Sequence, residues 1–187
     1  MAIILASGSP RRRELMAYIT ENFEVKVSDA DETTDLSLPP DRIVMSLAKQ
    51  KNDAVLPLCE SDDVIISADT IVYVDGEILG KPKNHDDAKN MLSKLSGRTH
   101  EVYTGVFIRT PNGNAGFADK TEVRFYDLSS EEIDRYINTG EPFDKAGGYG
   151  IQGRGAMLIE GIVGDYYNVV GFPVAHVGRV LKQLKVI

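Results

Sequence analysis

Residues 2–13 read AIILASGSPRRR, and this stretch decides how the fold begins. The apolar run 2–6 is typical of a short buried strand, because it is followed at once by small, turn-forming residues. Ser9 suits the N-cap of a helix and Pro10 suits its first position. The chain is therefore predicted to open with a strand that turns directly into a helix.

The rest of the chain intersperses predicted strands and helices. Periodicity and breaker residues predict further strands over 23–27, 64–74, 78–79, 101–109, 120–128 and 156–159. They predict helices over 40–56, 88–95, 129–137 and 173–184, with a polar loop over 28–40 and a glycine-dense loop over 145–155. Because strict strand–helix alternation is absent, we expect an α/β fold with a mixed β-sheet and flanking helices. We expect 1–187 to form a single domain with two lobes.

Composition excludes several classes of protein. Hydrophobic residues make up 42% of the 187 and charged residues 26%, which are ordinary globular values. The net charge of −7 argues against a general nucleic-acid-binding surface. The single cysteine, Cys59, excludes a disulfide framework and a cysteine-rich zinc site, and no apolar run approaches the length of a membrane span. We expect a cytoplasmic protein with no nucleic-acid or membrane partner.

The basic turn Arg11-Arg12-Arg13 is the first candidate binding site. These cations fall in the first turn of the predicted helix, where the helix dipole is positive and each of them is locally unfavourable. A phosphate group would relieve this, and backbone N–H groups, serine hydroxyls and guanidinium groups together suit phosphate. The alternative is a solvated basic turn that pairs with some of the many carboxylates.

Carboxylates supply the second candidate. Asp69 lies in the small polar group Ser67–Thr70 after a run of apolar residues, where it could hold a divalent cation or accept a proton from water. A turn aspartate that caps local backbone is an equally good interpretation. Asp31 and Glu32 offer further carboxylates, although in isolation they suit a surface loop.

Two glycine motifs resemble nucleotide-binding loops imperfectly. The motif from Gly76 to Lys81 is one residue short of a P-loop, and Pro82 replaces the residue that would hold magnesium. Lys81 could therefore bind a phosphate group or simply be a solvent-exposed lysine. Residues 148–153 match GxGxxG, but no strand precedes them, which excludes a dinucleotide fingerprint. Gln152 within this motif could contact a base edge or brace the loop.

Five motifs, in this order, resemble those of the Maf family of nucleoside triphosphate pyrophosphatases. They are LASGSPRR (5–12), SADT (67–70), GKP (80–82), KLSGRTH (94–100) and DKAGGYGIQG (144–153). The resemblance covers essentially the whole chain, and five ordered motifs are far more specific than any one of them.

The resemblance implies a fold, a reaction and a set of roles. It implies two lobes around a nucleotide cleft, often in a homodimer, and hydrolysis of a nucleoside triphosphate to the monophosphate and pyrophosphate with a divalent cation, Mg²⁺ or Mn²⁺. Asp69 corresponds to the family's proposed proton acceptor, and Glu32 is the best remaining carboxylate for the metal. The residues expected to bind the triphosphate are Ser7, Arg11, Arg12, Lys51 and Lys81.

The same resemblance also indicates which base the nucleotide substrate carries. Gln152, together with Arg12 and Thr70, resembles the subgroup that prefers dTTP and UTP, whereas a sister subgroup that acts on 7-methyl-GTP is expected to differ there. A nucleotide-binding regulator without turnover is the alternative class of protein. The sequence favours the enzyme, because a sensor does not need a carboxylate beside its phosphate-binding residues.

Overall fold

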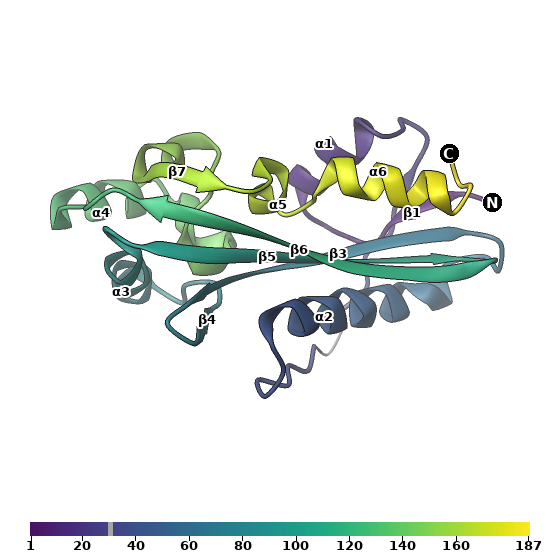
Figure 1. The fold of residues 1–187 in the computed structure, drawn as a ribbon, viewed down its shortest axis with the longest axis horizontal. Helices are drawn as coiled ribbons and strands as arrows, with labels where there is room; N and C mark the ends of the chain where they lie inside the picture. Colours follow the sequence, from purple (N-terminus) through teal and green to yellow (C-terminus); the bar gives the residue numbers. More distant parts are fainter. Residues whose placement is uncertain (30–31) are drawn as a thin grey trace. The chain divides into compact units, whose positions relative to one another are not determined.

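The computed structural model of the chain describes residues 1–29 and 32–187. Asp31, one of the carboxylates singled out above, lies outside these residues. The described part contains a seven-stranded sheet in the order β2-β1-β3-β5-β6-β7, with β4 paired to β3 (Figure 1). The strands are β1 (Ile3–Leu5), β2 (Glu24–Val25), β3 (Val64–Val74), β4 (Glu77–Leu79), β5 (Thr99–Thr110), β6 (Gly113–Phe125) and β7 (Ile159–Val163).

The sheet is mixed, as the sequence predicted. Strand β1 pairs in parallel with β2 and β3, whereas β3 with β4 and β6 with β7 pair antiparallel. The helices are α1 (Pro10–Ala17), α2 (Pro40–Val55), α3 (His85–Leu95), α4 (Ser130–Ile137), α5 (Tyr166–Val170) and α6 (Val174–Gln183). In the described residues, no helix combines the length and apolar character that crossing a membrane would require.

The chain divides into two compact units. Unit 1 comprises Met1–Asp69, Thr104–Asp119 and Gly171–Ile187, and unit 2 comprises Thr70–Tyr103 and Lys120–Val170. Strands β3, β5 and β6 therefore each contribute residues to both units.

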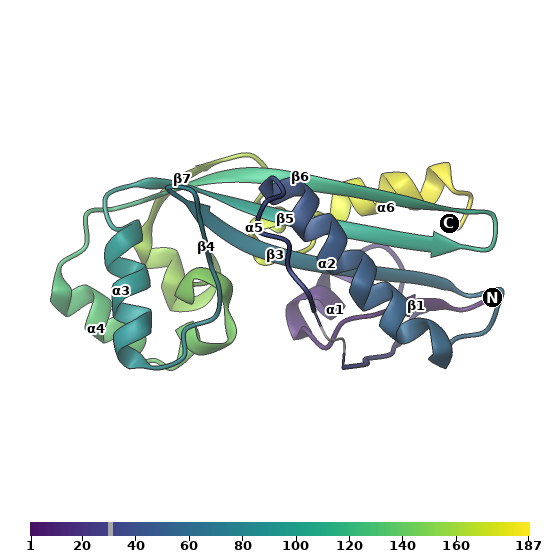
Figure 2. The same ribbon diagram turned by 90° about the horizontal axis from the view of Figure 1, so that it is seen from below.

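In unit 1, α2 covers one face of the sheet, and α1 and α6 lie on the other face (Figures 1 and 2). The apolar spacing of α2 explains its position, because Ile43, Val44, Leu47 and Ala48 are all buried. A Cβ atom added to Gly105 of β5 would lie 2.4 Å from the backbone carbon of Val44. The backbone of α2 therefore lies directly on the sheet, at a distance that only glycine permits.

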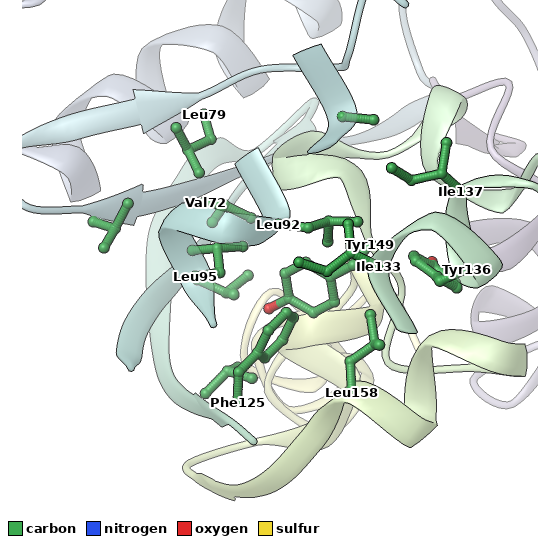
Figure 3. Packing of buried hydrophobic residues seen from close by; sticks show 14 residues of the cluster. Val72, Leu79, Leu92, Leu95, Phe125, Ile133, Tyr136, Ile137, Tyr149 and Leu158 are labelled. Carbon is green, nitrogen blue, oxygen red and sulfur yellow. The ribbon is translucent and has the colours of Figure 1, made fainter. Parts of the chain in front are cut away.

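In unit 2, α3 and α4 pack over a hydrophobic core that is shown in Figure 3. Local signals set the helix ends: the Asn84 side chain accepts a hydrogen bond from the Asp87 N–H, and Ser129 with Glu132 forms the predicted capping box. The predicted Asp75-Gly76 turn is also confirmed. Both residues have positive φ, of 50° and 82°, as a tight hairpin turn requires.

A buried polar pair lies inside the unit 2 core. His100 Nε2 is 2.6 Å from the hydroxyl oxygen of Tyr149, and both rings pack edge-to-face with Phe125. Tyr149 points into the core between its apolar neighbours (Figure 3). Burial lowers the pKa of His100 to about 4, so this imidazole is neutral in the folded protein at neutral pH.

Several boundaries predicted from the sequence differ from the structure by a few residues, and those of two strands are clearly wrong. Residues 156–159 were expected to form a strand, but Gly153–Leu158 is a 3₁₀ segment and β7 begins at Ile159. The reason is a close crossing of the backbone, since a Cβ atom on Gly155 would lie 2.1 Å from the Gly150 carbonyl oxygen. Strand β6 begins at Gly113 instead of 120 and ends at Phe125 instead of 128. The short helix α5 was not predicted.

We predict that Gly105→Ala lowers the free energy of unfolding by roughly 3 kcal/mol or more, because its methyl group would overlap the α2 backbone. Gly161→Ala in β7 is the matched control, since a Cβ atom there has no neighbour within 4 Å. Urea unfolding measures both changes. Equal stabilities of the two variants would show that α2 does not lie directly on Gly105.

We predict that His100 makes the fold acid-sensitive. Its folded pKa of about 4 lies below its ordinary value of 6.5, so the unfolded state binds the proton first. Stability is therefore complete above pH 6.5 and falls by up to about 3 kcal/mol as the pH drops towards 4. His100→Gln should flatten this pH dependence of urea unfolding, whereas the exposed His85→Gln should not. If the stability of His100→Gln depended on pH as that of the wild type does, His100 would not be the source of the acid sensitivity.

Candidate active site

The pairing of two parallel strands brings the first two sequence motifs together. Leu5 of β1 is in register with Ile66 of β3, and the Ala6 N–H donates to the Ile66 carbonyl at 2.7 Å. Parallel strands present their carboxyl ends at the same edge of a sheet. Ser7 therefore leaves β1 beside the segment that leads to Asp69.

Arg12 holds this edge together. Its Nη1 donates to the Ala68 carbonyl at 2.7 Å and lies 3.4 Å from the Ser7 hydroxyl oxygen, and its Nε donates to the Gly171 carbonyl at 2.8 Å. Burial lowers the pKa of this guanidinium, while the charges of Asp69 and Glu32 raise it. Arg12 was predicted to bind the triphosphate, yet two of its N–H groups are already committed to backbone carbonyls.

Asp69, Lys51 and Glu32 form what we call the carboxylate–lysine cluster. Lys51 Nζ forms an ion pair with Asp69 Oδ1 and lies 3.3 Å from Glu32 Oε1. The Asp69 side chain is only 12% exposed, whereas that of Glu32 is 40% exposed. The structure thus brings together the predicted proton acceptor, the predicted metal ligand and a predicted phosphate ligand, which come from three different segments.

Hydrogen bonds between α2 and β3 place Lys51 opposite Asp69. The buried Asn52 amide donates to the Ile65 carbonyl at 3.0 Å, and the Ser67 hydroxyl donates to the Ala48 carbonyl at 2.7 Å. Both side chains are fully buried, so these bonds fix the helix along the strand. The sequence interpretation overlooked Asn52, although an asparagine on the apolar face of a predicted helix is a signal for such an anchor.

The donor atoms of this cluster suit a hard divalent cation. Mg²⁺ and Mn²⁺ prefer oxygen ligands, and Mg²⁺ is commonly held by one or two carboxylates together with substrate phosphates. Glu32 and Asp69 provide two such carboxylates around one position. Among the described residues, no group of three or more His, Cys, Asp or Glu side chains is placed to hold a metal.

The remaining predicted site residues belong to unit 2. Thr70 follows Asp69 in β3, Lys81 is exposed after β4, and Gln152 is partly exposed at the start of the 3₁₀ segment. The loop that carries Lys81 and the glycine-dense loop lie side by side, because the Gly147 N–H donates to the Gly80 carbonyl at 2.9 Å.

Glycine geometry explains this close approach. Gly147 has a φ of +69°, and a Cβ atom on it would lie 2.8 Å from the Val72 side chain. Tyr149, which lies between Gly148 and Gly150, reaches into the core. Its hydroxyl group contacts His100 Nε2 and so anchors the loop. Gly148, the first glycine of the GxGxxG pattern, also has a positive φ of +71°, and a Cβ atom on it would lie 3.1 Å from the Pro82 side chain. This part of the pattern therefore reflects contacts of the loop within unit 2.

Comparison with known proteins identifies the family. The family model described as Maf-like protein matches residues 2–184. A dTTP/UTP pyrophosphatase of Bacillus cereus is 53% identical over 184 residues, which cover 98% of this chain and 96% of that protein. The protein of the same name from Bacillus cytotoxicus is 53% identical over 180 residues, covering 96% and 94%.

Among solved structures, a nucleoside-triphosphatase (dITP/XTP pyrophosphatase) of Mycobacterium abscessus aligns with a TM-score of 0.48 and 14% identity, covering 98% of each chain. The family model and the sequence relatives both span nearly the whole chain. The chain therefore belongs to the Maf family.

Proposed function

We propose that this protein is a nucleoside triphosphate pyrophosphatase that hydrolyses dTTP and UTP to the monophosphate and pyrophosphate. The observation that carries the proposal is the carboxylate–lysine cluster beside Ser7 and Arg12 at one edge of the sheet. Relatives that share about half of its residues are named dTTP/UTP pyrophosphatases, which supports the same reaction.

The reaction requires one bond to form and one to break. The water oxygen bonds to the α-phosphorus, the bond from that phosphorus to the bridging oxygen of the β-phosphate breaks, and pyrophosphate leaves with the electron pair. Asp69 orients the water and accepts its proton, since its carboxylate is buried and its backbone is fixed within β3. Such transfers depend mainly on positioning and charge neutralisation, which cationic side chains supply.

The roles of the phosphate-binding groups differ. Lys51 and Arg11 would supply positive charge to the phosphate oxygens, and Lys81 is proposed as a further phosphate ligand. Arg12 chiefly keeps Ser7 and the Ala68-Asp69 backbone in place through its bonds to carbonyls. Ser7, which is buried, offers its hydroxyl to the same edge.

A divalent cation, Mg²⁺ or Mn²⁺, would be held by Glu32 with Asp69. When bound, it neutralises negative charge on the phosphate oxygens. These two carboxylates come from different segments, and Asp69 is anchored within β3 whereas Glu32 lies in the loop before α2.

Gln152 is proposed to contact the base. Uracil and thymine offer an acceptor, a donor and an acceptor on their pairing edge, and one amide can accept from N3–H while it donates to a carbonyl. Thr70 and Arg12 accompany it as residues that match the dTTP/UTP subgroup, in contrast to 7-methyl-GTP.

A nucleotide sensor without turnover is the competing function. Pyrophosphate release from dTTP in the presence of Mg²⁺ distinguishes the two, because a sensor would bind dTTP and release nothing. Parallel assays with UTP and 7-methyl-GTP test the proposed substrate class.

We predict that Asp69→Asn lowers turnover by roughly 10²–10⁴-fold and leaves dTTP binding largely intact, because it removes the basic oxygen and keeps the side-chain size. Asp53→Asn is the control, since Asp53 lies on α2 and pairs with Lys49 outside the cluster. Steady-state kinetics and dTTP binding by calorimetry measure the two effects. Turnover like the wild type in the Asp69 variant would remove this carboxylate from the role of proton acceptor.

We predict that Gln152→Glu lowers kcat/KM for dTTP and UTP, since a carboxylate cannot donate to their carbonyl groups. The ratio of kcat/KM values should shift towards nucleotides whose base presents two neighbouring hydrogen-bond donors to the carboxylate. Gln183→Glu, an exposed change of the same chemistry at the end of α6, is the control. Kinetics on dTTP, UTP, CTP, ATP, GTP and 7-methyl-GTP give the ratios. Unchanged ratios would mean that Gln152 braces the glycine loop.

A further inference from the structure

We infer that Lys51 occupies the cation position of the site while the protein is unliganded, and that the site therefore accepts a divalent metal only together with a triphosphate. The inference rests on the proposed function and deepens it. It assigns to Lys51 the role of excluding the bare metal ion and admitting the complex of the metal with a triphosphate.

The contacts of Lys51 are those expected of a substitute cation. Its ammonium group pairs with Asp69 Oδ1 and lies 3.3 Å from Glu32 Oε1. These are the two carboxylates best placed to hold a metal, and Lys51 contacts one oxygen of each. A lysine ammonium is a compact point charge, so it can take the place of a small cation between two carboxylates.

A metal and this ammonium cannot share the position. Mg²⁺ binds carboxylate oxygens at about 2.1 Å, so a cation held by both residues would lie against Nζ in its present place. Two like charges at that distance repel strongly in a partly buried site. Lys51 must therefore withdraw before a metal can bind Glu32 and Asp69 together.

The charges of the site explain why a bare metal does not displace Lys51. Lys51 and Arg12 offset the charges of Glu32 and Asp69, and Arg11 adds a further positive charge that lowers the pKa of Arg12. A bare divalent ion would add two positive charges to a site whose carboxylates already have cationic partners. The anionic complex of a metal with a triphosphate instead brings its own negative charge, and it offers Lys51 a new partner.

Lys51 can move, whereas Arg12 cannot. Asn52 and Ser67 hold the α2 backbone against β3, which leaves the four-carbon side chain of Lys51 free to turn without moving the helix. Arg12 is fixed by two backbone carbonyls. Of the two cations, Lys51 is thus the one that can pass from carboxylates to phosphate.

The test is a titration of the full-length protein with Mn²⁺ alone, without nucleotide, followed by electron paramagnetic resonance. Lys51→Met should bind Mn²⁺ at least tenfold more tightly than the wild type, because it keeps the side-chain length and removes the charge. Lys49→Met is the matched control on the same helix, since Lys49 pairs with Asp53 at 2.5 Å, and it should bind Mn²⁺ as the wild type does.

Two further variants keep the result interpretable. Lys51→Arg retains the charge and should bind Mn²⁺ weakly, and adding Glu32→Gln to Lys51→Met should abolish the gain. Thermal unfolding shows that each variant is folded. Equal Mn²⁺ affinity of wild type and Lys51→Met, or a gain that survives loss of the Glu32 carboxylate, overturns the inference.

A separate titration distinguishes this inference from the proposed function. With a non-hydrolysable dTTP analogue present, the wild type should bind Mn²⁺ at least tenfold more tightly than without it. Pyrophosphate release from dTTP tests the enzyme itself. If release fails while Lys51→Met still gains Mn²⁺ affinity, the proposed function is wrong and the role of Lys51 in metal binding stands.

Discussion

The packing of helix α2 against strand β3 is the constraint on which the rest of the structure depends. Two buried hydrogen bonds, from Asn52 to the Ile65 carbonyl and from Ser67 to the Ala48 carbonyl, fix the helix along the strand. A shift by one helical turn would move a side chain by about 5.4 Å, which exceeds the reach of an ion pair. These bonds help to hold α2 in the register that places Lys51 opposite Asp69.

Polar groups at the edge of β1 and β3 divide into fixed and movable ones. Arg12 is bonded to two backbone carbonyls, whereas Lys51 pairs with the carboxylates of Asp69 and Glu32. The site therefore combines a rigid frame with one long cationic side chain that can exchange partners. An enzyme that binds and then releases a highly charged product benefits from this division, because preorganised groups cost no rearrangement, while Lys51 in its proposed role would move with the phosphate.

Local rules account for what the sequence predicted well. The capping box of 129–132 and helix 40–55 follow from side-chain chemistry and apolar spacing over a few residues. Residues 156–159 were assigned wrongly because the outcome depends on a backbone crossing from elsewhere in the loop. The attachment of Arg12 to carbonyls and the pairing of Lys51 with two carboxylates are tertiary effects that no spacing encodes. For the site, the sequence thus supplied the residue types through resemblance, and the structure supplied their partners.

Unit 1 is assembled from three separate stretches of the chain, and this has a consequence for protein synthesis. Arg12 donates to the carbonyl of Gly171, which is 159 residues further along the chain. A ribosome that has completed the first helix and strands must still translate the whole of unit 2 before the last stretch of unit 1 emerges. Contacts over such separations form slowly, because a long loop has to close first. The edge that carries Ser7 and Arg12 is thus completed at the end of translation, and until then Arg12 can bond to the Ala68 carbonyl but not to that of Gly171.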